Sequence, residues 1–494
     1  MKHLSVRAIA LALLLAFCLT GCGTEQSDTK TTDPAESDSS STTEIDTSNL
    51  SDAEKRKLVS DDLKTVDFGD REFNILSRTD FTYEFDSEQT GDVLDDAVYN
   101  RNRTVEERFN VKIVTHAYGE GTQGNVLELA NKSIEAGDDE YQLLSAYSYL
   151  AAPGSLNGLY LNWYDVPNVN FEKPWWENGY IDEASINGVA YLAVGDLSLL
   201  FNEVKLAIFF NKNIAENVKT GDLYSLVRDG DWTIDKLIEV SALGSDDLNG
   251  DGKMDENDRW GFACNRWTHT IPFLYAADMK MVYRDENGIP NQFNESEKLF
   301  DLFEKVYKFI NESGDAYICN DGKFSLPNES DFPSDKALFM TSWIGYAANL
   351  RNMEADFGII PYPKWDKEQE NYPSFYLDRT DAFLMPLTVD QEFAGTITEA
   401  LAAESYKQVI PAFYEKALYG KYTRDEESRE MLDIILKNAS YDFAYIYSKH
   451  FGSTSTYEIY RSCIYNKDDS FASKLASVKT QYLALLDTLL ESFQ

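Results

Sequence analysis

One acidic loop has residue types and a spacing that could bind a metal ion. Residues 247–258 read DLNGDGKMDEND, in which oxygen-bearing side chains alternate around Gly252. A hard cation such as Ca²⁺ takes about six to eight oxygen ligands, and an EF-hand-type loop supplies them at alternating positions around a glycine turn. The predicted ligands are Asp247, Asn249, Asp251, the backbone carbonyl of Lys253, Asp255 and Asp258. We predict a structural Ca²⁺ ion here; a solvated Asp/Asn/Gly turn is the alternative, because Asp258 stands where a longer Glu is usual.

Other motifs that could carry chemistry are weaker. Residues 119–124, GEGTQG, match the glycine pattern of a dinucleotide-binding loop, but the next predicted strand ends without an acid for the ribose. The chain has four histidines and neither a His-Glu-x-x-His nor a Gly-x-Ser-x-Gly motif. We therefore predict an ordinary loop at 119–124 and no enzymatic activity. A glycosidase-type carboxylate pair stays open as an alternative, because the 84 acids show no distinctive spacing.

Composition limits the partners of the chain. Its 494 residues carry a formal net charge of −39, and so acidic a surface repels the phosphates of nucleic acids. With 43% hydrophobic residues the chain can bury a large core. Apart from Cys18 and Cys22 near the N-terminus, the cysteines are Cys264, Cys319 and Cys463, which allow at most one disulfide.

The N-terminus has the features of a secretory signal. Lys2 and Arg7 accompany an apolar run, residues 8–19, that is too short to span a bilayer. The run ends in Leu-Thr-Gly-Cys, which resembles a bacterial lipobox. That resemblance implies that residues 1–21 are removed and that Cys22 is lipidated, which would anchor the protein on the extracytoplasmic face of the cell membrane. Residues 22–65 are rich in Ser, Thr and Asp and are predicted to be a disordered tether.

Strand-like and helix-like patterns alternate from residue 66 onward. The patterns predict strands at 72–78, 110–116 and 141–148 and helices at 92–109 and 125–139. Strand and helix in this order predict a parallel α/β layer. Later segments predict a strand and a helix within 204–217, a helix at 231–243 with Thr233 as N-cap, helices at 295–313 and 391–419, a strand at 357–363, and helices through 425–494.

Three segments carry a family resemblance. They read VAYLAVGDLSLLFNEVKLAIFFNKNIAEN (189–217), KALFMTSWIGYAANLRNMEADFGIIPYPK (336–364) and DRTDAFLMP (378–386). Together they resemble the family 1 extracellular solute-binding proteins of ABC importers, whose best-known member is the maltodextrin-binding protein. The resemblance implies a type II periplasmic-binding-protein-like α/β fold, in which two lobes flank a central cleft and close on the ligand by a hinge motion. With the strand and helix patterns, it predicts a first lobe at 66–200 and 376–424 and a second lobe at 201–375 that carries the calcium-type loop. The resemblance covers most of residues 66–420; residues 425–494 are predicted from their own pattern to be a helical part packed on the second lobe.

Sugar sites combine aromatic platforms with side chains that donate and accept hydrogen bonds. The resemblance places Trp343, in TSWIGYA, in the binding site. The other aromatic candidates are Trp175, Trp176 and Trp267. Polar contacts are predicted at strand ends and crossings, where α/β sheets place ligands: Asp80, Tyr83, Tyr147, Asp196, Arg379 and Asp381. A packing role for each tryptophan and a surface ion pair for each charged residue are the alternatives.

These features together predict a lipid-anchored substrate-binding protein of an ABC importer that captures a mono- or oligosaccharide. The expected partners are the solute and the ABC permease subunits, with the membrane contacted only through the anchor, no nucleic acid, and a monomeric protein. Two other functions stay open: a lipid-anchored extracellular glycan hydrolase, and a binder of peptides or other polar solutes.

Overall fold

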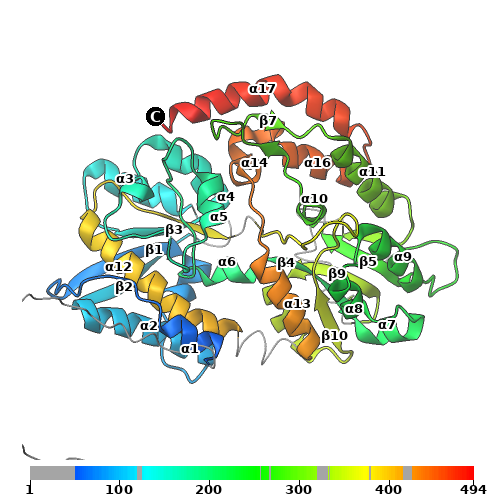
Figure 1. The fold of residues 1–494 in the computed structure, drawn as a ribbon, viewed down its shortest axis with the longest axis horizontal. Helices are drawn as coiled ribbons and strands as arrows, with labels where there is room; N and C mark the ends of the chain where they lie inside the picture. Colours follow the sequence, from blue (N-terminus) through cyan, green and yellow to red (C-terminus); the bar gives the residue numbers. More distant parts are fainter. Residues whose placement is uncertain are drawn as a thin grey trace, which may run out of the picture. The chain divides into compact units, whose positions relative to one another are not determined.

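The computed structural model describes residues 50–119, 125–255, 257–265, 269–319, 332, 334–377, 380–414 and 425–494. Two mixed β-sheets, each with helices packed on it, organise this part of the chain (Figure 1). Cys22 and the rest of residues 1–49 lie outside the described residues. None of the helices described is long and apolar enough to cross a membrane.

The first lobe is built on a four-stranded sheet with the strand order β11-β3-β1-β2. Strands β1 (Arg71–Arg78), β2 (Val111–Tyr118) and β3 (Leu143–Tyr147) are parallel, whereas β11 (Asp381–Leu384) runs antiparallel to β3. Helices α2 (Val93–Phe109) and α3 (Val126–Ala136) connect the parallel strands, which confirms the predicted parallel layer. The other elements of this lobe are η2 (Thr79–Glu84), α4 (Ser148–Gly154), η4 (Ser155–Asn157), η5 (Trp163–Asp165), α5 (Asn178–Ala184), α12 (Gln391–Glu404) and η7 (Ser405–Val409).

The second lobe is built on a five-stranded sheet with the order β10-β4-β9-β5-β8. In it β4 (Leu206–Asn211) is antiparallel to both neighbours, β9 (Ala337–Trp343) and β10 (Phe357–Ile360), and β5 (Trp260–Asn265) is parallel to β8 (Ala316–Cys319) and β9. The Thr233 hydroxyl accepts a hydrogen bond from the Lys236 N–H at the start of α9, which confirms the predicted N-cap. The other elements are α7 (Lys212–Val218), α8 (Leu223–Arg228), α9 (Ile234–Gly244), α10 (Pro272–Ala276), the hairpin of β6 (Val282–Tyr283) and β7 (Gln292–Phe293), α11 (Glu297–Asn311) and η6 (Ile344–Asn352).

Three segments run side by side where the chain passes between the two sheets. Helix α6 (Leu199–Glu203) leads from the first lobe into β4. Directly after it, Lys205 forms a β-bridge with Tyr376, and Ser374 forms another with Ala439. The crossing therefore contains α6, residues 374–377 and the segment that follows α13 (Glu426–Lys437).

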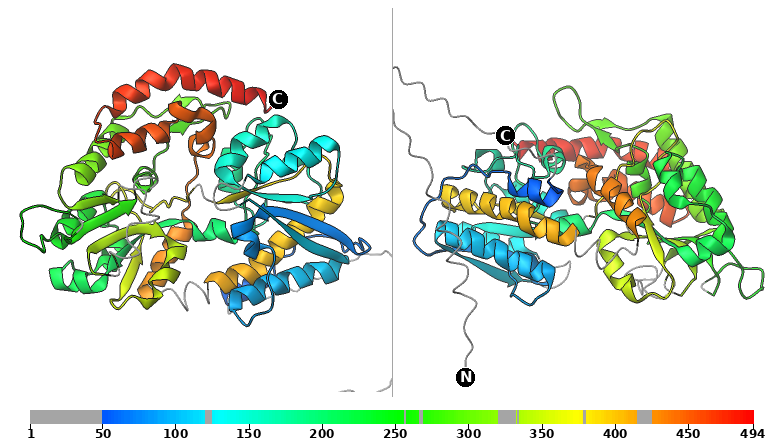
Figure 2. Two further views of the ribbon diagram at one scale, coloured as in Figure 1. Left: turned by 180° about the vertical axis from the view of Figure 1, so that it is seen from behind. Right: turned by 60° about the horizontal axis from the view of Figure 1, so that its bottom comes forward.

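The C-terminal helices contact both lobes. Helix α13 packs on β10 and α8, and α16 (Thr456–Tyr465) and α17 (Phe471–Glu491) pack on α11, all in the second lobe. In contrast, α14 (Phe443–Ile446) contacts α5 and α15 (Ser448–Phe451) contacts α4, both in the first lobe. Figures 1 and 2 show α17 extending over both lobes toward the C-terminus. The expected packing on the second lobe thus describes only part of this segment.

The segment predicted to be a tether ends earlier than expected. Within residues 50–65 the structure contains helix α1 (Asp52–Lys57), which begins with a capping box between Ser51 and Glu54. Asp61 accepts a hydrogen bond from Arg108 of α2 at 3.1 Å. The Asp61–Arg108 and Asp62–Lys173 ion pairs attach residues 50–65 to the first lobe, and Val59 and Leu63 pack against its core.

Candidate functional site

The parallel strands of the first lobe end at a buried ion pair. Arg78 is the last residue of β1 and bonds to Asp381, the first residue of β11; both side chains are fully buried. The Ser145 hydroxyl donates to the second oxygen of Asp381 at 3.0 Å. The Arg78 guanidinium lies over the rings of Phe81, at 4.1 Å, and Tyr147, at 5.2 Å. The pair thus fixes the orientation of two aromatic rings at the strand ends.

Helix η2, which follows β1, connects these strand ends to the crossing. The buried Glu84 accepts hydrogen bonds through one oxygen from the Leu200 N–H and the Ser198 hydroxyl, at the start of α6. Burial raises the pKa of Glu84 well above its usual value, and the nearby Asp381 and Glu203 raise it further. Glu84 therefore joins η2 to the start of α6 through a carboxyl group whose neutral form is favoured by burial.

Tyr83 and Glu203 form a polar pair next to this contact. Tyr83 is partly exposed, and its hydroxyl donates to Glu203 Oε2 at 3.3 Å. Burial raises the pKa of Glu203 to about 7, while the hydrogen bond from Tyr83 acts in the opposite direction. A hydroxyl and a carboxyl group so placed can donate to and accept from a hydroxylated ligand.

Trp343 lies on the second-lobe side of the same crossing. It ends β9, pairs with Leu206 across the sheet, and is half-buried. The following residue, Ile344, donates its N–H to the Lys205 carbonyl at 2.9 Å. At Gly345 a Cβ atom would lie 3.2 Å from the Cβ of Glu203, so this turn packs closely on α6. Trp343 and the Tyr83–Glu203 pair thus border one crossing from opposite lobes.

Comparisons with known proteins identify the fold. No family model matches the chain, and no curated protein matches it either. Among solved structures, an ABC substrate-binding protein of Listeria monocytogenes in complex with cycloalternan matches with a TM-score of 0.54 and 11% identity over 85% of this chain and 99% of that one. The fold is that of the type II periplasmic binding proteins.

Two further solved structures share this binding-protein fold. The maltodextrin-binding domain MalE of Bdellovibrio bacteriovorus, bound to maltotriose, matches with a TM-score of 0.51 and 15% identity over 84% of this chain and 100% of that one. UgpB of Mycobacterium tuberculosis, in complex with glycerophosphocholine, matches with a TM-score of 0.55 and 12% identity over 85% and 99%. The predicted fold class, with two lobes, is confirmed.

The structure brings together part of the predicted site. Tyr83 and the exposed Asp80 lie in η2, Tyr147 contacts Arg78, and Asp381 pairs with Arg78. Asp196 lies next to the crossing: its N–H donates to the Trp175 carbonyl at 2.8 Å, its carboxyl group bonds to Asn202 of α6, and the charge of Lys205 acts on it. Burial raises the pKa of Asp196 to about 7. Trp267 and Arg379 lie outside the described residues.

The two adjacent tryptophans belong to the core of the first lobe rather than to a ligand surface. Trp175 and Trp176 are 1% and 5% exposed. Their indole N–H groups donate to the two oxygens of Glu399, at 3.0 and 2.8 Å. Glu399 comes from α12, far along the sequence, and is itself fully buried. The prediction that these rings bind ligand is corrected, because their polar atoms are already satisfied inside the lobe.

Sequence reasoning missed three residues that organise the site, namely Arg78, Glu84 and Glu203. Two of them are charged residues at the end of an apolar stretch: EFNILSR ends in Arg78, and SLLFNE ends in Glu203. A charged residue that directly follows a buried run often turns toward a partner at the sheet edge, and this was the available signal. The partners themselves, Asp381 and Tyr83, are distant in sequence.

The predicted calcium loop folds as a series of side-chain-capped turns. Asp247 accepts from the N–H groups of Gly250 and Gly252, at 2.7 and 2.8 Å, and both glycines have positive φ. Asp258 is fully buried and accepts from the N–H groups of Leu248 and Asp255. Within the residues that the structure describes, no group of three or more His, Cys, Asp or Glu side chains is arranged to hold a metal ion. Calcium binding therefore stays a prediction.

Proposed function

We propose that this protein is the extracytoplasmic substrate-binding component of an ABC importer and that it captures a carbohydrate. The observation that carries the proposal is the fold, shared over most of the chain with proteins solved in complex with cycloalternan and with maltotriose. The aromatic and carboxyl side chains at the crossing support it, because sugars are bound by flat rings and by groups that both donate and accept.

The site residues suggest how a sugar would be held. Trp343 offers a ring from the second lobe, and Tyr83 and Tyr147 offer rings from the first. The Glu203 carboxyl and the Tyr83 hydroxyl would bond to sugar hydroxyls. Contacts made from both lobes at once favour the arrangement in which the lobes enclose the ligand. The protein would act by binding and release, without a chemical step.

A ligand screen tests this proposal. The chain with Cys22 replaced by serine is melted with maltotriose, cycloalternan, tagatose, glycerophosphocholine and a peptide mixture, and each mixture is also assayed for products. A ligand whose concentration is about a hundred times its Kd raises the free energy of unfolding by about 2.7 kcal/mol. We expect a raised melting temperature with at least one saccharide and no product. If only glycerophosphocholine or peptides stabilise the protein, its ligand is not a carbohydrate. If a glycan is converted to product at enzymatic speed, the protein is an enzyme rather than a binding protein.

A tryptophan variant locates the site. Trp343→Ala removes the second-lobe ring and is expected to lower the affinity for the saccharide at least about tenfold, since stacking contacts on aromatic rings contribute on the order of 1 kcal/mol or more. Trp365→Ala is the matched control, because Trp365 is also half-buried in the second lobe but lies under Lys305. Isothermal calorimetry measures both. If Trp343→Ala binds the saccharide with wild-type affinity, Trp343 is not part of the binding site.

We also propose that Cys22 is acylated and that the protein works at the membrane surface with ABC permease subunits. The support is the lipobox-like sequence that precedes Cys22 and the extracytoplasmic use of this fold in importers. Mass spectrometry of the N-terminal peptide from cells tests the anchor: a diacylglyceryl group on Cys22 is expected, and an unmodified N-terminus elsewhere would refute it. Co-purification with permease subunits tests the partner.

We further propose that the loop at residues 247–258 binds Ca²⁺ and stabilises the second lobe. The support is the ligand pattern in the sequence and the tight turns at Gly250 and Gly252, both of which have positive φ. The role would be structural, since the loop belongs to none of the elements that border the crossing.

A further inference from the structure

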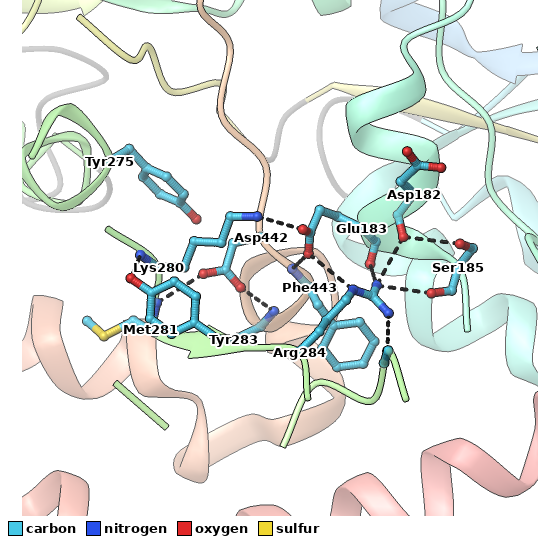
Figure 3. A network of polar contacts seen from close by, with 12 residues as sticks. Asp182, Glu183, Ser185, Tyr275, Lys280, Met281, Tyr283, Arg284, Asp442 and Phe443 are labelled. Atoms are coloured by element: carbon cyan, nitrogen blue, oxygen red, sulfur yellow. Dashed lines mark hydrogen bonds and ion pairs between the residues drawn. The ribbon is translucent and has the colours of Figure 1, made fainter. Parts of the chain in front are cut away.

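The C-terminal helices join the second lobe to the first through a network of polar contacts (Figure 3). Its centre is Glu183, on α5 of the first lobe. Lys280 lies just before the β6–β7 hairpin, which belongs to the second lobe. Its Nζ forms an ion pair with Glu183 Oε1 at 2.5 Å. The N–H of Phe443, the first residue of α14, donates to Glu183 Oε2 at 3.2 Å. One carboxylate thus contacts both the hairpin and the C-terminal helices.

Arg284 of the hairpin strengthens this junction. Its Nη2 lies within hydrogen-bond distance of three first-lobe carbonyls, those of Asp182, Glu183 and Ser185, at 3.0, 2.8 and 3.0 Å. Its Nη1 donates to the Gly288 carbonyl at 2.7 Å within the hairpin. These carbonyls lie in the last turn of α5 and at its C-cap, where the carbonyl ends carry partial negative charge, so a guanidinium is well placed there.

The C-terminal segment adds contacts of its own to the first lobe. The Tyr447 hydroxyl donates to the Ala184 carbonyl at 2.8 Å, and the Tyr191 hydroxyl donates to the Ser492 carbonyl at 2.9 Å. The Tyr441 ring fits against Gly179, where a Cβ atom would lie only 2.8 Å from it. The contacts therefore extend from the start of the segment to its last residues.

An aromatic cluster joins the same segment to the crossing. Tyr180 of α5 packs against Phe201 of α6, Tyr376 and Tyr441, with ring centroids 6.2, 5.8 and 5.9 Å away. These rings are buried. Moving α5 relative to the C-terminal segment would therefore expose aromatic surface as well as separate the ion pairs.

We propose that the β6–β7 hairpin and residues 441–494 form a brace that holds α5 of the first lobe to the second lobe and restricts lobe motion to rotation about this contact. In a freely hinged binding protein the lobes are joined only by their crossings and can open widely. In this protein the brace joins the two lobes whether or not a ligand is bound. The lobes can therefore separate only on the side away from the brace. The inference goes beyond the proposed function, because it concerns the lobes before any ligand binds.

The charged contacts of the brace differ from ordinary surface ion pairs. The side chains of Lys280, Glu183 and Arg284 are 29%, 17% and 24% exposed, so water screens them only in part. Exposed pairs contribute about 0–1 kcal/mol each, whereas networks that share a partly buried carboxylate contribute more. Removing both cations leaves the aromatic contacts in place but frees α5 from the hairpin.

Pulsed electron paramagnetic resonance tests the brace in the ligand-free chain. Spin labels are attached at Glu107→Cys on α2 and Glu216→Cys on α7, which are exposed and lie in different lobes. Cys18, Cys22 and Cys319 are replaced by serine, while Cys264 and Cys463 are buried and are left in place. We expect one narrow distance distribution in the otherwise unchanged chain. In the double variant Lys280→Gln/Arg284→Gln we expect the distribution to become about twice as wide or to gain a second maximum.

The matched control is Lys479→Gln, which breaks the pair with Glu295 at 2.7 Å on the second-lobe side only and should leave the distribution narrow. Should the double variant fail to fold, Tyr447→Phe with Tyr191→Phe removes two hydroxyl contacts and should also widen it. A folded double variant with an unchanged distribution overturns the brace, as does a broad distribution in the starting chain. Because no ligand is added, a failure to bind saccharides would leave this result unaffected.

Discussion

Glu399 supports a prediction about stability and pH. This carboxyl group is fully buried in the first lobe and accepts the indole N–H groups of Trp175 and Trp176. Burial raises its pKa from the usual 4.5 to about 7, although the bonds from the two indoles and from the Asn170 N–H act in the opposite direction. Replacing Glu399 with Gln keeps the shape of the side chain and removes its titration.

The magnitude follows from the difference between the two pKa values. An acid whose pKa is raised on folding destabilises the folded state above the folded pKa and has no such effect below the unfolded pKa. At 1.36 kcal/mol per pKa unit, the change from 4.5 to about 7 corresponds to about 3 kcal/mol. The wild type therefore gains about 3 kcal/mol from this group as the pH falls from 8 to 4.5, and Glu399→Gln does not.

Thermal unfolding of both proteins across this pH range measures the effect. For the unit Leu50–Gln494, an unfolding entropy of about 2.1 cal/mol/K per residue makes 3 kcal/mol equal to about 3 °C in Tm. The Tm of the variant relative to wild type should therefore be about 3 °C higher at pH 8 than at pH 4.5. The effects of the other titrating groups cancel in this difference in Tm, because the wild type and the variant share those groups.

The matched control is Glu392→Gln, an exposed acid in the first turn of the same helix. The difference in Tm between the Glu392→Gln variant and the wild type should be nearly the same at pH 8 and at pH 4.5. Parallel curves of Tm against pH for wild type and Glu399→Gln would show that folding does not raise the pKa of Glu399. The effect assigned to burial of this carboxyl group would then be wrong.

Two further predictions concern the ion pair and the loop. Asp381→Asn removes the negative charge that faces the buried Arg78 and should destabilise the protein by about 3 kcal/mol or more in urea denaturation; Asp390→Asn, which breaks an exposed pair with Arg71, should cost less than about 1 kcal/mol. An equal loss in both variants would contradict the role given to the buried pair. Exhaustive EDTA treatment should lower Tm without abolishing ligand binding, and the lowering should be absent in Asp247→Asn/Asp251→Asn; an unchanged Tm would argue against a bound metal.

Local patterns in the sequence predicted the elements of the fold well. The helix predicted at 92–109 is found at Val93–Phe109, and the strand predicted at 72–78 is found at Arg71–Arg78. Both depend on side-chain periodicity within one segment, which the sequence displays directly. The predicted tether was too long because two ion pairs and the apolar side chains of Val59 and Leu63 attach residues 50–65 to the first lobe.

Site residues were harder to predict, because their roles depend on partners distant in sequence. Trp175 and Trp176 were predicted as ligand platforms because they lie in an aromatic run that follows the strands of the first lobe. In the structure their two indole N–H groups are bound inside the lobe. The acceptor is Glu399. Nothing near residue 175 in the sequence indicates that a single carboxyl from α12 satisfies both groups. Trp343 was predicted from a resemblance that includes its neighbours, and the structure pairs it with Leu206, next to the crossing, while Gly345 packs on Glu203.

The same crossing explains why the C-terminal helices matter for function. The candidate site borders α6 through Tyr83, Glu203 and Trp343, and the aromatic cluster of the brace packs on α6 through Phe201. A change in the angle between the lobes moves both sets of contacts, since they share this one short helix. Ligand affinity and the strength of the brace should therefore be coupled: a brace that already limits opening lowers the ordering cost of enclosing the ligand. Loosening it with Lys280→Gln/Arg284→Gln should weaken binding even though neither residue borders the site.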